Sequence, residues 1–266
     1  MKRAIALGVV VSAILWVTPV SVSSSAPGDE ADVVVEWNQI LQRTLPGTAG
    51  IQGPRYYAMM HVAMFDAIAA IDQAFSPFRA RIRSSRGASA EAAAAQAAHD
   101  VLAALIPSAL SAYDAALAAR LAGIPPGRAA QGIRAGREAA AEILAWRQND
   151  GWSAPEPGYS VPPFPGLWQV TPGSTMAGFT RVPGVQPFAL LTVTQFLPPR
   201  PPVLTSAAYT EDFDEVKGIG SVMSPTRTSF QTRTALIWAG GATLTRTNLF
   251  AVWNNVARDA ALARGL

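Results

Sequence analysis

Two histidines, His61 and His99, are the side chains of this sequence that titrate near neutral pH without perturbation, and the chain contains no cysteine. Acid–base or metal chemistry would therefore rely on these imidazoles or on carboxylates. Asp66 follows His61 by five residues, so the two side chains do not share one helical face. His99 directly precedes Asp100, and adjacent side chains of a helix are expected to point apart. We therefore predict that both histidines are hydrogen-bonded members of a helical core.

A zinc site made of His61, His99 and one carboxylate stays open as an alternative, although no His-Glu-x-x-His or comparable ligand spacing is present. The absence of cysteine excludes disulfide scaffolds, thiolate zinc sites and cysteine nucleophiles. The sequence also lacks the Gly-x-Ser-x-Gly elbow of hydrolases and the glycine-rich loops that bind nucleotides. No common catalytic motif is therefore found.

Four carboxylates crowd the start of a predicted helix and could supply paired acid–base groups: Glu211, Asp212, Asp214 and Glu215. The positive end of the helix dipole explains acidic residues there more simply. Lys217 precedes Arg227-Thr228 by ten residues, and the two cations could together bind an oxyanion. We favour a helix C-terminal cation at Lys217, because Gly218 and Gly220 follow it in a turn.

The N-terminus has the order of a secretory signal, with Lys2-Arg3 followed by an apolar run over residues 4–17 and then small residues. The apolar run is shorter than the ~20 residues that span a bilayer. We predict a signal peptide over residues 1–26, a mature region over 27–266, export to the periplasm or the extracellular space, and no stable membrane insertion after cleavage. Removal of Lys2 and Arg3 leaves 19 basic and 18 acidic side chains, a net charge of +1, which argues against nucleic acid as a partner.

The elements that would position these residues are helices throughout, and the sequence predicts an all-α fold. Apolar residues recur at three- and four-residue steps, as in the stripe Tyr57, Met60, His61, Met64, Ile68 and Ile71, and Pro or Gly ends each run. Small residues at many positions let helices approach closely, which predicts a compact bundle. The predicted helices cover residues 33–45, 54–71, 90–106, 108–121, 128–148, 206–219, 226–238 and 248–264.

Residues 149–205 form a proline-rich connecting segment in which no long helix or central strand fits. Its aromatic residues favour burial, so we predict an ordered segment laid over the bundle, with a disordered tether as the alternative. These aromatic residues are Tyr159, Phe164, Trp168, Phe179, Phe188 and Phe196. Ser89 and Ser206 are predicted N-caps of the helices that they precede. In the helices after residue 205, Phe213 and Val216 are expected to point inward, and Trp253 and Val256 belong to an apolar stripe that needs a partner surface.

The sequence resembles the N-terminal helices of bacterial vanadium-dependent haloperoxidases, a family grouped with the type 2 phosphatidic acid phosphatases. The resemblance runs from about residue 33 to residue 266 and depends on the order and spacing of several short motifs. These are Trp37-Asn38, Pro54-Arg55, Met60-His61-x-Ala63-x-x-Asp66-Ala67, Pro201-Pro202-x-Leu204-x-Ser206, Tyr209, Glu215-Val216-Lys217-x-x-Gly220, Ser224-x-x-Arg227-Thr228-x-x-Gln231, Ala235-x-x-Trp238 and Trp253-Asn254.

The resemblance implies an all-helical haloperoxidase/acid phosphatase fold, and intact relatives use vanadate and peroxide to oxidise halide. In the family, the oxyanion is held by a Lys with Arg-Pro seven residues later, by Pro-Ser-Gly-His, and by Ser-Arg with a later His. Arg200-Pro201 has Val193 in place of that lysine, Pro172-Gly173-Ser174 is not Pro-Ser-Gly-His, and Ser85-Arg86 has Ala92 in place of the histidine. Hence no catalytic, cofactor-binding or metal residue is assigned.

We therefore expect an incomplete version of that fold, with a missing C-terminal half, that does not bind vanadate tightly and is inactive alone. A missing half supplied by a partner, or self-association through the last helix, would cover its apolar surface. Two alternatives stay open, namely a secreted helical binding module that uses the aromatic segment for contact, and a phosphatase-type relative.

Overall fold

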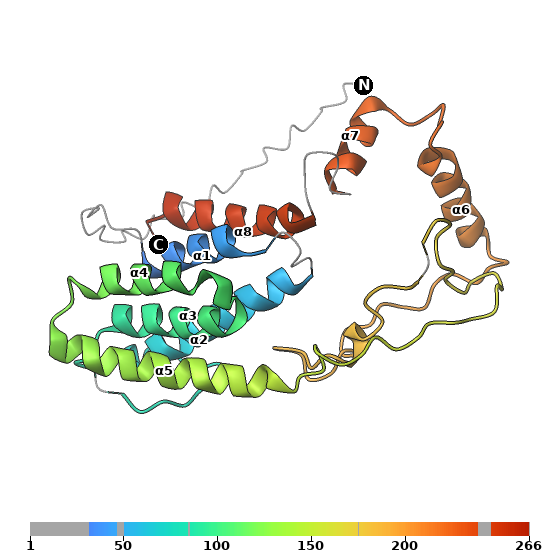
Figure 1. Ribbon diagram of the computed structural model, residues 1–266. Coiled ribbons are helices and arrows are strands. Elements are labelled where there is room, and N and C mark those ends of the chain that lie inside the picture. Colours follow the sequence, from blue (N-terminus) through green and yellow to red (C-terminus); the bar gives the residue numbers. More distant parts are fainter. Residues whose placement is uncertain (1–31, 47–50, 85, 175, 239–245, 266) are drawn as a thin grey trace, which may run out of the picture.

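The computed structural model describes residues 32–46, 51–84, 86–174, 176–238 and 246–265, and the predicted signal peptide lies outside them. Each regular element within these ranges is helical, which confirms the predicted all-α class (Figure 1). The elements are α1 (Val33–Thr44), α2 (Gln52–Asp72), α3 (Ala90–Leu105), the short 3₁₀ helix η1 (Pro107–Ala109), α4 (Leu110–Leu121), α5 (Pro126–Gln148), the 3₁₀ helix η2 (Val182–Gly184), α6 (Ala207–Gly220), α7 (Ser229–Trp238) and α8 (Arg246–Ala263).

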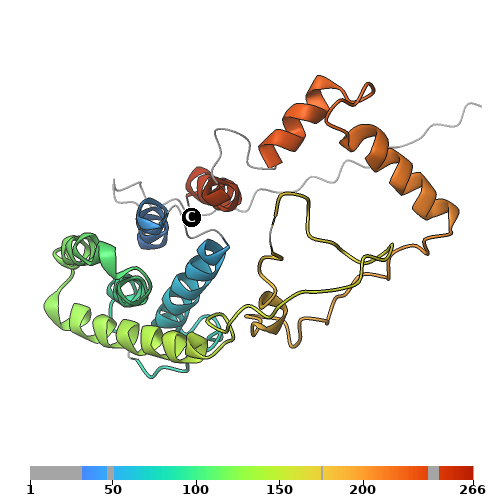
Figure 2. The ribbon, with the colours of Figure 1, turned by 45° about the vertical axis from the view of Figure 1, so that its right-hand side comes forward.

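Helices α1 to α5 form a bundle with the alanine-rich helix α3 at its centre, in contact with α1, α2, α4 and α5 (Figure 2). Alanine favours helix because its side chain loses no rotamer freedom, and its small volume lets neighbours come close. Residues 92–98 of α3 are fully or almost fully buried. Trp37, Leu41 and Met60 supply the larger side chains of the core. The compact helical bundle predicted from the small residues is therefore present.

Helix α5 approaches α3 through two glycines, Gly132 and Gly136. A Cβ atom at Gly132 would lie 2.3 Å from the Ser89 carbonyl oxygen, and one at Gly136 would lie 2.4 Å from the Ala93 carbonyl oxygen. These distances are below van der Waals contact, so only glycine allows this helix separation.

Local hydrogen bonds explain where the helices begin. The Ser89 hydroxyl accepts from the Ala92 amide at the start of α3, and the Ser206 hydroxyl accepts from the Tyr209 amide at the start of α6. Both predicted N-caps are confirmed.

The segment after α5 leaves the bundle as a long arm, defined here as residues 149–238, which carries α6 and α7 (Figures 1 and 2). Between residues 149 and 205, its described part contains only the short helix η2, as the prolines predict. The prediction that its aromatic residues are buried over the bundle is wrong for most of them, since Phe164, Trp168 and Phe196 are more than half exposed. Phe188, near the bundle, is the exception and packs against the core.

The inward orientation predicted for Phe213 and Val216 is also wrong, because Phe213 is 52% and Val216 69% exposed. Helix α6 lies out on the arm, and no described element covers its apolar side.

Helix α8 returns to the bundle and lies beside α1 (Figures 1 and 2). The face toward α1 and α2 carries Asn254 and Arg258 together with Ala257 and Ala261, the small residues of the predicted apolar stripe. Within that stripe, Trp253 and Val256 are more than half exposed, and Trp253 stacks on Trp238 of α7 at 6.1 Å between ring centroids. None of the described helices is long and apolar enough to cross a membrane.

Candidate functional site

His61 lies at the junction of α1, α2 and α8, where two asparagine side chains join it in a chain of hydrogen bonds. The Asn38 Nδ2 group donates to His61 Nε2 and to Asn254 Oδ1, both at 2.9 Å, and Asn254 Nδ2 donates back to Asn38 Oδ1 at 2.8 Å. Because an amide nitrogen can only donate, His61 Nε2 accepts and its ring proton resides on Nδ1. The predicted hydrogen-bonded histidine is therefore confirmed for His61.

The surroundings of His61 favour uncharged groups. Burial lowers the pKa of His61, and burial raises the pKa of Tyr57, whose ring stacks on the imidazole, to about 12. Both side chains are therefore neutral at pH 7. The adjoining cavity of about 370 Å³ is lined largely by apolar residues such as Val34, Val35 and Ala257. The Nε2 lone pair of His61 is bound to the Asn38 amide, which in turn binds Asn254 of α8, so His61 is not free to act as a base.

His99 lies between two carboxylates, with Nδ1 at 2.7 Å from Asp100 Oδ1 and Nε2 at 2.9 Å from Asp114 Oδ1. The expectation that Asp100 points away from His99 is wrong. Neighbouring helix positions diverge at Cβ, but Asp100 also accepts from Gln96 Nε2 at 2.7 Å and is turned toward the imidazole. The two histidines contact different partners.

Among the described residues, no group of three or more His, Cys, Asp or Glu side chains is arranged to hold a metal ion.

A buried ion cluster at the end of α5 was not predicted from the sequence. Asp150 accepts from Arg55 Nη2 at 2.9 Å and from Arg147 Nη2 at 2.6 Å, and the Arg147 guanidinium also lies over the Phe188 ring at 4.0 Å. Burial raises the pKa of Asp150, but the Trp152 amide and the two guanidinium groups outweigh that effect and hold this pKa below its usual value. The cluster attaches the beginning of the arm to the bundle.

The sequence contained a local signal for this cluster, because Arg147 and Asp150 are three residues apart at a helix end. The contribution of Arg55, 95 residues earlier, carries no local signal. Its role appears only when α2 and the end of α5 are placed side by side.

The cations considered for oxyanion binding have other roles. Arg227 donates from Nη1 to the carbonyl oxygens of Ile219 and Ser221, both at 2.8 Å, and so completes the C-terminus of α6. Lys217 is exposed in the last turn of α6, as the helix-dipole interpretation predicts. The acidic residues of α6, Glu211, Asp212, Asp214 and Glu215, are exposed as well. The first turn of α6 contains no acidic residue, so the explanation of these residues by the helix start is wrong.

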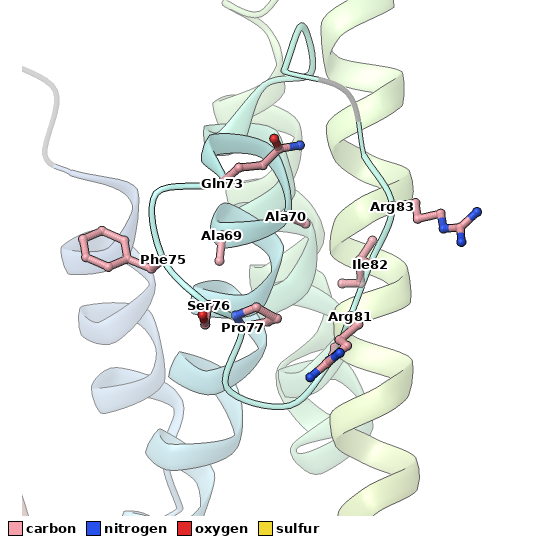
Figure 3. Close-up of a pocket in the computed structure, with 10 residues that line it drawn as sticks. Ala69, Ala70, Gln73, Phe75, Ser76, Pro77, Arg81, Ile82 and Arg83 are labelled. Atoms are coloured by element: carbon pink, nitrogen blue, oxygen red, sulfur yellow. The ribbon is translucent and has the colours of Figure 1, made fainter.

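Asp66 is fully buried and holds the loop that follows α2, a role that no local sequence pattern predicted. Its carboxylate accepts backbone N–H groups of Phe78, Arg79 and Ala80 at 2.5, 3.0 and 2.7 Å. The loop encloses an open groove of about 720 Å³ against the end of α2 (Figure 3). In this view the Arg83 side chain points away from the helices, while Arg81 lies at the lower rim.

No protein-family model matches the sequence, and no curated protein is significantly similar to it. The structure is similar to the crystal structure of a protein described as the first bacterial vanadium-dependent iodoperoxidase, with a TM-score of 0.59 and 21% sequence identity. The similarity covers 81% of this chain and 56% of that one. This chain therefore spans just over half the length of that protein and shares its fold.

Proposed function

We propose that this chain forms the front helices of a haloperoxidase-type protein and does not retain vanadate by itself. The observation that supports this most directly is the extent of the structural similarity. The bundle α1 to α5 makes up less than half of the chain, whereas the similarity to the iodoperoxidase covers 81% of it. The shared fold must therefore extend into the arm, which a general likeness between helical bundles does not require.

The described residues do not fit vanadate. An oxyanion needs several cationic and amide donors that converge on one volume. Each arginine whose side chain is buried or partly buried already binds protein groups: Arg55 and Arg147 bind Asp150, Arg120 binds Glu36 and Glu91, Arg181 binds Glu156, Arg227 binds carbonyl oxygens, and Arg258 binds Gln42. His99 lies between carboxylates, which repel an anion. No reaction step through vanadate is therefore derived for these residues.

The exposed apolar side chains of the arm suit contact with further polypeptide. Of the thirty exposed large hydrophobic residues described, four lie in the bundle, twenty-two in the arm and four in α8. Surfaces of this kind mark interfaces rather than free surface. We propose that the polypeptide in contact with the arm corresponds to the part of the iodoperoxidase fold outside the match. The match covers 56% of that protein.

We also propose export with removal of residues 1–26.

Titration with orthovanadate, followed by ⁵¹V NMR and tryptophan fluorescence, tests the first proposal. We expect no saturable binding at micromolar protein and no peroxide-dependent iodide or bromide oxidation above the level of free vanadate. The control is the same protein checked for helicity by circular dichroism. Saturation at one vanadate per chain would contradict the proposal.

A helical binding module is the second candidate, supported by the exposed aromatic residues of the arm. Size-exclusion chromatography distinguishes the binding module from the front part of a haloperoxidase-type protein. A monodisperse species that stays stable over a wide concentration range favours the module. Concentration-dependent aggregation favours a fold that needs more polypeptide.

A further inference from the structure

The loop that follows α2 has an unusual composition. Residues 73–88 contain four arginines, Arg79, Arg81, Arg83 and Arg86, and no acidic residue. All four are exposed. The loop runs along the outer edge of the bundle (Figure 1), and its residues Phe78 and Arg79 lie against Trp146 near the end of α5, where the arm begins. A basic surface is thus concentrated in one place on a protein whose net charge is only +3.

Two of these arginines form no ion pair with a described residue. In the described part of the chain, Arg81 and Arg83 form no ion pair or hydrogen bond, while Arg86 bonds to Gln73 and Arg79 lies over the Trp146 ring at 5.1 Å. Glu138 and Glu142 face Arg79 and Arg81 across a neighbouring hollow without forming an ion pair. The partly buried arginines elsewhere are bound by carboxylates or carbonyl oxygens. In contrast, the positive charges of Arg81 and Arg83 remain available to a ligand.

Exposed phenylalanines accompany these arginines. The bundle exposes four large hydrophobic residues, and three of them are Phe65, Phe75 and Phe78, at 41%, 70% and 46%. Phe65 of α2 lies beside Phe75, with 6.4 Å between ring centroids. Aromatic rings in this position have no partner within the described fold beyond one another and Trp146.

Part of the loop backbone, at residues 78–80, is fixed in place despite its exposure. The three hydrogen bonds to Asp66 hold residues 78–80 against α2, and the groove between loop and helix has a floor that includes Ala69, Ala70 and Ile82 (Figure 3). Arg81 and Arg83 belong to its lining. A preformed surface loses little conformational entropy on binding.

We propose that this loop binds the surface of a membrane that contains anionic phospholipid. Arginines bind phosphate oxygens through paired N–H groups, and each basic residue near an anionic membrane adds attraction. Phenylalanines add affinity by entering the boundary between headgroups and acyl chains. The phenylalanines favour lipid over a water-soluble polyanion, because a polyanion gives them no apolar medium. The chain would lie on the bilayer and not cross it.

Vesicle flotation of the full chain tests this proposal. We expect the protein to float with phosphatidylcholine vesicles that contain phosphatidylglycerol and not with pure phosphatidylcholine, and to be released as salt is raised. Arg81→Glu with Arg83→Glu should weaken binding about tenfold or more. Phe75→Ser, at the most exposed of the three rings, should weaken it about threefold or more.

The matched control is Arg200→Glu with Arg233→Glu, which makes the same charge change at two exposed arginines of the arm. Its affinity for the vesicles should fall less than twofold. Equal weakening by the control and by the loop variant would overturn the proposal, as would an unchanged affinity of Phe75→Ser. Binding of heparin that depends on Arg81 and Arg83, without any binding of vesicles, would assign the loop to soluble polyanions instead.

Discussion

Replacing Gly136 by alanine adds one methyl group where α5 meets α3. That Cβ would lie 2.4 Å from the Ala93 carbonyl oxygen, 2.8 Å from Gln96 Cβ and 2.9 Å from the Ala97 amide nitrogen. Two of these three atoms are backbone and cannot rotate away, so the helices must separate by about 1 Å to restore normal contact. Overpacking of this kind costs about 1–3 kcal/mol.

Alanine also has the better helix propensity, which offsets the cost by about 1 kcal/mol. We therefore expect Gly136→Ala to lower the free energy of unfolding by up to about 2 kcal/mol. Urea denaturation followed by tryptophan fluorescence measures this change, since Trp37 is fully buried in the same core.

Gly127→Ala is the matched control, because a Cβ there meets no atom within 4 Å. It should leave stability unchanged or raise it by up to about 1 kcal/mol. If Gly136→Ala proves more stable than the wild type, the close approach of α3 and α5 is refuted.

Three further predictions concern buried polar groups. Asp150→Asn should destabilise the protein by about 3–5 kcal/mol, because it leaves Arg147 buried without its counter-ion. The wild type should also lose stability below about pH 4, where the Asp150 carboxylate with its lowered pKa becomes protonated, and the variant should lose less stability over that range. His61→Gln should remove a loss of stability that the wild type shows as pH falls below about 6.5, because the imidazole takes up a proton more readily in the unfolded chain than in the folded one. Melting curves at pH 7.5 and 5.5 measure this pH dependence, and a variant that retains it would contradict the prediction. Asp66→Ala should cost about 1–3 kcal/mol and speed hydrogen exchange at the amides of residues 78–80, and unchanged exchange there would show that the carboxylate does not hold the loop.

The arm shows why apolar composition alone is a poor guide to burial. Its aromatic residues have the same preference for burial as those of the bundle. The path of the chain carries them away from the bundle, so that preference is unmet by the described residues. An apolar sequence therefore indicates that a surface needs cover, and the tertiary structure decides whether this chain provides it.

The sequence by itself determined the all-α class, the approximate ends of the helices and the caps Ser89 and Ser206. These features depend on residues within about one helical turn of one another, so the local pattern contains the information.

Tertiary structure alone decided which polar groups meet. Asn38 and Asn254 are 216 residues apart, and Arg55 and Asp150 are 95 apart, so no local pattern couples them. Tertiary structure also decided that Asp66 accepts from the loop after α2 and that α6 exposes Phe213. A buried carboxylate or amide must find hydrogen-bond partners, but which partners it finds depends on which helices the chain path brings together.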